Sequence, residues 1–211
     1  MRITKYEHAT LLLTVGEENL VVDPGVFLAA PDFADVTAIV ITHEHGDHWT
    51  PEQLRRLLDK NPDARILAPQ GVAGRGRDEF TVEVVSAGDV VEVGPFKLAF
   101  YGGSHEVIHS SLPDIDNLGV LVNDEFYYAG DSYAVPDVEV GTLAAPIGAP
   151  WLKIGDAMDY VLEVKPKRAF YTHDMTLSVA GKQLGAERLT WATEQNGGTF
   201  TTLQPGETLD I

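Results

Sequence analysis

A cluster of metal-binding residues constrains the fold of this chain more than any other feature. Four side chains of the types that bind metals lie within six positions of Thr42-His43-Glu44-His45-Gly46-Asp47-His48. The segment follows residues 36–41, an apolar, β-branched run that predicts a buried strand. It precedes residues 50–53, where Thr, Pro and Gln at their positions predict a helix N-cap, first turn and capping box for a helix over 51–60. The cluster is therefore expected on a strand-to-helix turn.

This cluster predicts a metal site rather than a polar loop. Three histidines and an aspartate would compete for the same few partners if they were only structural, because each buried polar group needs its own. On a turn, His43 and His45 can bind one metal while Asp47 and His48 reach a second beside it. The chain has no cysteine, so any metal must be held by His, Asp or Glu. These ligands suit Zn²⁺ first, with Mn²⁺ or Fe as alternatives.

Length and charge limit the classes of protein and partner. The 211 residues fit a single domain spanning 1–211. The longest N-terminal apolar run, residues 9–15, is too short and too polar for a signal peptide or membrane span, so a cytoplasmic location with no membrane partner is expected. The net charge of −17 disfavours nucleic acid. The basic residues in 75–77 precede Asp78 and Glu79, and we interpret them as a solvated loop.

The order of expected elements predicts two β-sheets packed face to face with helices outside. Strands are expected at 2–7, 9–15, 19–22, 36–41, 65–68, 81–85, 90–93, 96–101, 118–122, 125–129 and 168–171. Helices are expected at 51–60, 155–164 and 180–196, the last ending at an Asn-Gly-Gly stop. Residues 199–211 are expected to form a final hairpin.

Three further expected strands also end in a residue that can bind a metal. His105 follows Gly102-Gly103-Ser104 after one strand, and Asp131 follows Gly130 after another. His173 comes directly after Thr172 at the end of a third. Asp131 alone would be a turn residue. Four strand ends with the same property predict that these residues meet at one site.

The ordered set of ligand-type residues resembles the metallo-β-lactamase fold superfamily across nearly the whole chain. Residues 21–25, Val-Val-Asp-Pro-Gly, are similar to that superfamily's first motif, which has a structural Asp, here Asp23. The resemblance implies an α/β (α+β) fold, a four-layer αββα sandwich with a dinuclear site along one edge. It implies one metal held by His43, His45 and His105, a second held by Asp47, His48 and His173, and Asp131 bridging them.

Departures from the superfamily's branches narrow the expected activity. The β-lactamases commonly use a cysteine ligand that this chain lacks, and His45 stands where the flavodiiron branch has Glu. Residues 6–10 and 145–148 are loosely similar to the ascorbate-6-phosphate lactonase-like hydrolases. His109 could line the substrate cleft, support a ligand from behind or cap its loop. His8 is interpreted as a structural residue that supports the fold near the strand edge, with approach to the cleft as the less favoured alternative.

These observations predict a metal-dependent hydrolase that uses a hydroxide bound by two divalent metals to cleave a small ester, lactone or phosphate-bearing metabolite. Asp47 and Asp131 are the expected catalytic residues, with Asp47 orienting the hydroxide as well as binding metal. Asp23, Thr42 and Thr172 are candidate partners behind the ligands. The alternatives are a phosphodiesterase or nuclease on the same metal pair, and a non-catalytic metal-binding protein. A small-molecule substrate is expected, and the sequence makes no prediction about oligomeric state.

Overall fold

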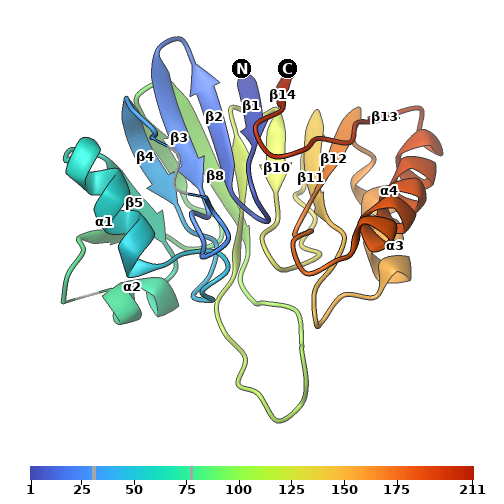
Figure 1. Cartoon of the computed structure of the whole chain (residues 1–211), viewed down its shortest axis with the longest axis horizontal. Helices are drawn as coiled ribbons and strands as arrows, with labels where there is room; N and C mark the ends of the chain where they lie inside the picture. The colour runs from blue at the N-terminus through green and yellow to red at the C-terminus, as the bar shows by residue number, and fades with distance from the viewer. Residues whose placement is uncertain (30–31, 77) are drawn as a thin grey trace.

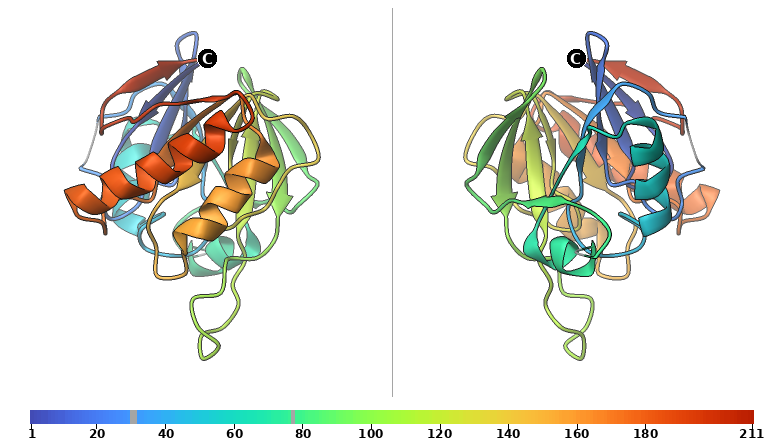
Figure 2. Two further views of the ribbon diagram at one scale, coloured as in Figure 1. Left: turned by 90° about the vertical axis from the view of Figure 1, so that its right-hand side faces the viewer. Right: turned by 90° about the vertical axis from the view of Figure 1, so that its left-hand side faces the viewer.

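Two β-sheets pack face to face and helices cover their outer faces, so the expected four-layer αββα sandwich is confirmed (Figures 1 and 2). The structure is a computed structural model that describes residues 1–29, 32–76 and 78–211. No helix formed by these residues is long and apolar enough to cross a membrane.

The first sheet has seven strands in the order β14-β1-β2-β3-β4-β5-β6. Its strands are β1 (Arg2–Lys5), β2 (Leu11–Val15), β3 (Glu18–Val22), β4 (Val36–Val40), β5 (Arg65–Ala68), β6 (Val82–Val84) and β14 (Thr208–Asp210). The pairs from β14 to β3 are antiparallel, and those from β3 to β6 are parallel. Parallel pairing needs crossover connections, and the segment after β4 makes one of them.

The second sheet also has seven strands, in the order β13-β12-β11-β10-β9-β8-β7. Its strands are β7 (Val90–Val93), β8 (Phe96–Gly102), β9 (Leu118–Val122), β10 (Phe126–Tyr128), β11 (Thr142–Pro146), β12 (Arg168–Thr172) and β13 (Thr199–Phe200). Strands β10 to β13 are parallel, so the carboxyl ends of β10, β11 and β12 lie at the same edge of the sheet. That edge carries Asp131 and His173.

Alternation of side chains along the strands builds separate apolar layers. In β8, Phe96, Leu98 and Phe100 lie in the core between the two sheets, whereas Ala99 belongs to the layer under the helices. Helices α1 (Pro51–Lys60) and α2 (Gln70–Gly76) lie beside the first sheet, and α3 (Ile154–Val164) and α4 (Val179–Glu194) cover the second (Figure 1). Apolar burial on both faces fixes the sheets and hence their edges.

Helix α1 begins as the sequence predicts, but the capping box is only half formed. Thr50 Oγ1 accepts a hydrogen bond from the Gln53 backbone N–H at 3.2 Å. The Gln53 side chain donates instead to the Leu28 carbonyl oxygen at 2.8 Å. Gln53 therefore ties the segment after β3, which carries Asp23, to the helix that follows the histidine cluster.

The secondary structure differs from the sequence-based expectations in three places. Residues 199–211 do not form a hairpin, because β13 pairs with β12 and β14 pairs with β1 in the other sheet. Strand β11 was not predicted, since it contains Ala and Pro and is buried on both faces, which removes the alternating pattern. Helix α2 was not predicted because three of its seven residues are glycine. Arg75 lies in this helix rather than in a solvated loop, and Arg77 lies outside the described residues.

A long connection between β8 and β9 extends from the body of the molecule (Figure 1). We call residues 103–117 the projecting segment. Its base is fixed to the sandwich by Gly103 and Asn117, which exchange backbone hydrogen bonds, and by Gly71 N in α2, which donates to Asp116 Oδ2 at 3.0 Å. The segment starts beside the histidine cluster and carries both His105 and His109.

Candidate metal centre

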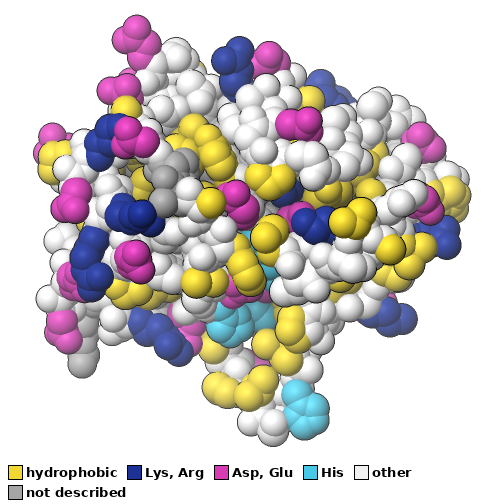
Figure 3. Space-filling model, in the orientation of Figure 1, with side chains coloured by type: hydrophobic (Ala, Val, Ile, Leu, Met, Phe, Trp, Pro, Cys, Tyr) yellow, Lys and Arg dark blue, Asp and Glu magenta, His cyan; other side chains and the backbone are white. Residues whose placement is uncertain are grey.

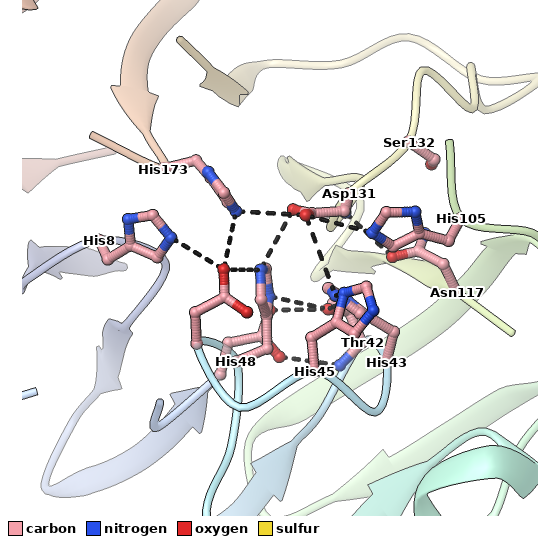
Figure 4. Close-up of polar contacts among 12 residues, drawn as sticks. His8, Thr42, His43, His45, His48, His105, Asn117, Asp131, Ser132 and His173 are labelled. Carbon is pink, nitrogen blue, oxygen red and sulfur yellow. Dashed lines mark hydrogen bonds and ion pairs between the residues drawn. The ribbon is translucent and has the colours of Figure 1, made fainter. Parts of the chain in front are cut away.

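The predicted ligand residues lie together at one edge of the sandwich (Figure 4). They follow β4, β8, β10 and β12, whose ends meet there. Two groups can each offer ligand atoms within 4.8 Å of one another. The first group is His43, His45, His105 and Asp131, and the second is His8, Asp47, His48 and His173.

The histidine rings are oriented by oxygen atoms behind them. His48 Nδ1 donates to Asp23 Oδ2 at 2.7 Å, and His43 Nδ1 donates to Thr42 Oγ1 at 3.1 Å. His105 Nδ1 and His173 Nδ1 donate to the carbonyl oxygens of Glu106 and Gly148, each at 2.5 Å. Because these partners accept, they fix a ring proton on Nδ1, so Nε2 is the nitrogen that can offer a lone pair to a metal once the ring is neutral. Four Nε2 atoms are thus prepared to bind a metal.

Asp131 lies between the two groups. Its Oδ1 is 3.1 Å from His48 Nε2, and its Oδ2 is 3.2 Å from His173 Nε2 and 3.4 Å from His105 Nε2. Burial alone would raise the pKa of this carboxyl group, but His48 and His173 hold it well below its usual range. Asp131 is therefore ionised and faces both groups, which is the position expected of a bridge.

Several buried atoms in this centre make no hydrogen bond to the described residues, although the three histidines concerned lie within ion-pair distance of Asp131. They are Nε2 of His48, His105 and His173 together with Asp131 Oδ1. Leaving such polar atoms unpaired in the interior costs about 1–3 kcal/mol each, and more for charged groups. The atoms are of the types that bind divalent metals, and they face a common space. The residues present therefore fit two divalent metal ions.

Asp23 lies behind the ligands, as the sequence predicts. This fully buried carboxylate accepts hydrogen bonds from Thr42 N at 2.8 Å and Thr42 Oγ1 at 2.7 Å, in addition to the one from His48. Thr42 in turn accepts from His43, so one carboxylate orients a histidine in each group. Thr172 does not join this network, because its buried Oγ1 makes no hydrogen bond within the described part of the chain.

His8, interpreted from the sequence as structural with approach to the cleft as the less favoured alternative, reaches the site. Its Nε2 lies 3.2 Å from Asp47 Oδ2, and its ring centroid is 3.9 Å from that of His173. Its Nδ1 accepts a hydrogen bond from the Met175 backbone N–H at 3.2 Å. The neutral ring must therefore carry its proton on Nε2 and donate it to Asp47. This arrangement makes His8 a support for Asp47 rather than a ligand.

Close contacts and uncommon backbone conformations restrict which residues the positions around the site can accept. A Cβ atom on Gly25 would lie 1.8 Å from the Asp47 carbonyl oxygen, so only glycine allows this contact. His8, Asp23 and His173 all adopt a positive φ, which is uncommon for residues with side chains. Such conformations persist where the surrounding structure determines them, and they often occur at functional sites.

The comparisons with known proteins agree with this geometry. Residues 2–173 match the sequence profile described as the Beta-lactamase superfamily domain. The chain belongs to this superfamily. Protein Rv0786c of Mycobacterium tuberculosis is 37% identical over 199 residues, which cover 90% of this chain and 92% of that protein.

Other known proteins resemble the chain more distantly. The UPF0173 metal-dependent hydrolase SSO0099 of Saccharolobus solfataricus is 28% identical over 229 residues, covering 97% of this chain and 96% of that protein. The structure of Igni18, a metallo hydrolase from Ignicoccus hospitalis, has a TM-score of 0.76 at 16% identity and covers 100% of this chain and 98% of that one. The prediction of a metal-dependent hydrolase of this superfamily is confirmed at that level.

The structure separates the two histidines of the projecting segment. His105 belongs to the first group, whereas His109 is exposed and its Nδ1 is hydrogen-bonded to Ser111 Oγ at 2.8 Å. His109 does line the cavity that opens beside His45 and His105. It therefore lines the cavity beside the first group and belongs to neither ligand group.

Trp151 is a site residue that sequence reasoning missed. Its indole N–H donates to Asp131 Oδ2 at 2.9 Å, and its ring lies 6.0 Å from that of His105. The residue stands in the connection between β11 and α3, and β11 itself was not predicted. The loose similarity of residues 145–148 to lactonase-like hydrolases was the one signal nearby.

Proposed function

We propose that this protein hydrolyses a small ester, lactone or phosphate-bearing metabolite at a site that holds two divalent metal ions, zinc in the first instance. Ions bound there would lower the pKa of water from 15.7 towards about 7 and draw electron density from the carbonyl or phosphoryl oxygen. The first ion is assigned to His43, His45 and His105, the second to Asp47, His48 and His173, and the bridge to Asp131.

The observation that carries this proposal is the common orientation of the histidines. In His43, His48, His105 and His173, an oxygen atom holds the Nδ1 proton and directs Nε2 towards Asp131 and its neighbours. Three of these Nε2 atoms are buried and make no hydrogen bond to the described residues. A protein that used the histidines only for stability would leave fewer polar atoms unpaired.

The chain's own residues hold the reacting groups in place. Asp47 is partly exposed, with 29% of its side chain accessible, so it can meet water or substrate at the mouth of the site. His8 donates to Asp47 Oδ2 and fixes that carboxylate, which is then able to orient the attacking water. Trp151 holds Asp131 from the other side. The two carboxylates expected to act in catalysis therefore each have a dedicated donor.

Two other functions compete with this proposal. A phosphodiesterase or nuclease could use the same residues, but the net charge of −17 opposes a long polyanionic substrate. A non-catalytic metal-binding protein would not need a carboxylate open to solvent beside the ligands, because structural metal sites are closed. A small-molecule substrate fits the charge and the site better than either alternative.

A panel of substrates tests the proposed function. Zinc-loaded protein would be assayed with a p-nitrophenyl ester, a γ-lactone, p-nitrophenyl phosphate and bis-p-nitrophenyl phosphate, and Asp131→Asn would be assayed beside it. We expect metal-dependent turnover of at least one small substrate that falls at least tenfold in Asp131→Asn. Turnover of none of them, or turnover that persists in metal-free protein, would contradict the proposal.

A further inference from the structure

A cavity of about 150 Å³ opens directly beside His45 and His105, under the projecting segment. Histidine, acidic and apolar side chains gather where that segment leaves the body of the protein (Figure 3). A substrate whose reacting carbonyl meets the proposed metals can place the group next to that carbonyl in this cavity. The lining of the cavity therefore determines which substrates the site accepts.

The charges of the lining oppose an anionic group. Arg75 is the only cation among the described lining residues, and its Nη2 binds Glu44 Oε1 at 2.7 Å. Glu106 and Asp114 also line the cavity and add negative charge. A phosphate or carboxylate entering here would meet like charges, and no cationic side chain among the described lining residues is free to pair with it, which is unfavourable.

Cations behind the second group are also engaged. Lys5 is fully buried and binds Asp174 Oδ1 at 3.1 Å. Lys182 binds the other oxygen of Asp174 at 2.5 Å. Burial lowers the pKa of Lys5, but Asp174 beside it opposes that shift. Both lysines therefore hold the turn that carries His173, and neither is available for a substrate anion.

Apart from its charged residues and three histidines, the lining of the cavity is apolar. Val107 is 64% exposed, Leu112 is 51% exposed and Ile108 is 36% exposed, all in the projecting segment. Exposed apolar side chains grouped beside a catalytic centre mark a place where apolar surface is covered on binding. An aliphatic group of the substrate gains free energy here in proportion to its buried area.

The size of the cavity limits that group. A protein cavity of about 150 Å³ lined by apolar side chains accepts benzene, so about six carbon atoms fill such a space. We propose that the substrate is an uncharged ester or lactone with a short aliphatic group of about four to six carbons, held against Val107, Ile108 and Leu112. This inference rests on the proposed function and removes phosphate-bearing metabolites from its substrate range.

A series of p-nitrophenyl esters with acyl chains of increasing length tests whether the cavity binds an aliphatic group. One buried methylene changes affinity about fourfold, so the four methylenes added from acetate to hexanoate at half burial give about a 15-fold rise in kcat/KM. Leu112→Ser should reduce this rise. Leu184→Ser is the matched control, because Leu184 is 53% exposed on α4 and does not line the cavity, and it should keep the rise. A flat series in the wild-type protein would overturn the inference.

A charged ester of the same chain length tests whether the substrate must be uncharged. In the mono-p-nitrophenyl ester of adipic acid, a carboxylate replaces the terminal methyl group of the hexanoate chain. We expect its kcat/KM to be at least tenfold below that of the hexanoate, and the ratio to narrow in Asp114→Asn. A preference for the anionic ester, or for p-nitrophenyl phosphate over hexanoate, would overturn the inference while leaving a metal-dependent hydrolase in place.

Binding to metal-free protein gives a readout that does not depend on turnover. With a chelator present, 1-hexanol and 1-hexyl phosphate would be titrated while the methyl resonances of Val107, Ile108 and Leu112 are followed. We expect hexanol to shift these resonances and to bind more tightly than hexyl phosphate. No shift with hexanol, or tighter binding of hexyl phosphate, contradicts the inference even if no ester is hydrolysed. Failure of the whole substrate panel with these shifts present would instead contradict the proposed function.

Discussion

Replacing Asp23 by asparagine should weaken the binding of one metal ion. The two side chains have nearly the same size, so the change leaves the packing around the site intact. The Asp23 carboxylate is buried and accepts three hydrogen bonds, two from Thr42 and one from His48 Nδ1. An amide has one acceptor oxygen and one NH₂ group. If the oxygen keeps the Thr42 backbone N–H, the NH₂ group faces His48 Nδ1. His48 then takes the other tautomer and carries its proton on Nε2, the atom assigned to the second metal.

The size of the effect follows from the bond that is lost. A hydrogen bond to a charged partner contributes about 1.5–3 kcal/mol. Since each 1.4 kcal/mol is a tenfold change in an equilibrium constant, the second ion should bind roughly 10- to 150-fold more weakly. The first ion, held by His43, His45 and His105, should change much less. Its link to Asp23 passes through the Thr42 hydroxyl group, which can rotate.

Competition with a chromophoric chelator measures the two affinities. Metal-free protein would be titrated with Zn²⁺, and circular dichroism would check that the variant is folded. Asp89→Asn is the matched control, because Asp89 Oδ2 is an exposed acceptor that receives the Ser86 backbone N–H at 2.8 Å. The reasoning is refuted if folded Asp23→Asn binds both zinc ions as tightly as the wild-type protein.

Further predictions concern the same centre. Elemental analysis at saturation should give two divalent ions per chain, and a limit of one with every metal tried would exclude the paired site. His105→Ala should lose metal whereas His109→Ala should keep both ions, and the reverse result would exchange their roles. His8→Ala should lower turnover and His8→Gln, which keeps an N–H donor, should restore part of it; equal rates would remove the proposed support of Asp47. Burial lowers the pKa of His173, but Asp131 beside it raises that pKa to about 9 in metal-free protein. The ring is therefore protonated at neutral pH, so zinc binding should release protons into a weakly buffered indicator solution and should weaken as the pH falls below 9.

Local patterns were sufficient to predict much of this structure. An apolar run followed by glycine or threonine and then a ligand-type residue predicts a strand end, and the structure brings His105, Asp131 and His173 together from such ends. The start of α1 was predicted for a similar reason, because Thr50 and Pro51 act within their own turn. The assignment of each ligand to a metal stays a prediction.

Features that depend on distant contacts were not predictable in this way. His8 reaches Asp47 because its backbone pairs with the turn after β12, where His173 N donates to His8 O at 2.9 Å. No spacing in the sequence reports that contact. Strand β13 likewise joins the second sheet only through its partner β12, and a short polar segment before a turn suggests a hairpin equally well.

The contact between His8 and the turn after β12 has a consequence for the order in which the protein is made. His43, His45 and His105 all lie in the first half of the chain, so a nascent chain contains the first set of ligands before the rest of the protein has been made. The second set is different, because it is completed by a turn whose Met175 N–H binds His8 across a sequence separation of 167 positions. The entropy cost of closing so long a loop must be met before the contacts it forms can stabilise it. In the proposed two-ion site, uptake of the second ion would therefore come late in synthesis, and a ribosome-stalled fragment ending before His173 should retain one ion at most.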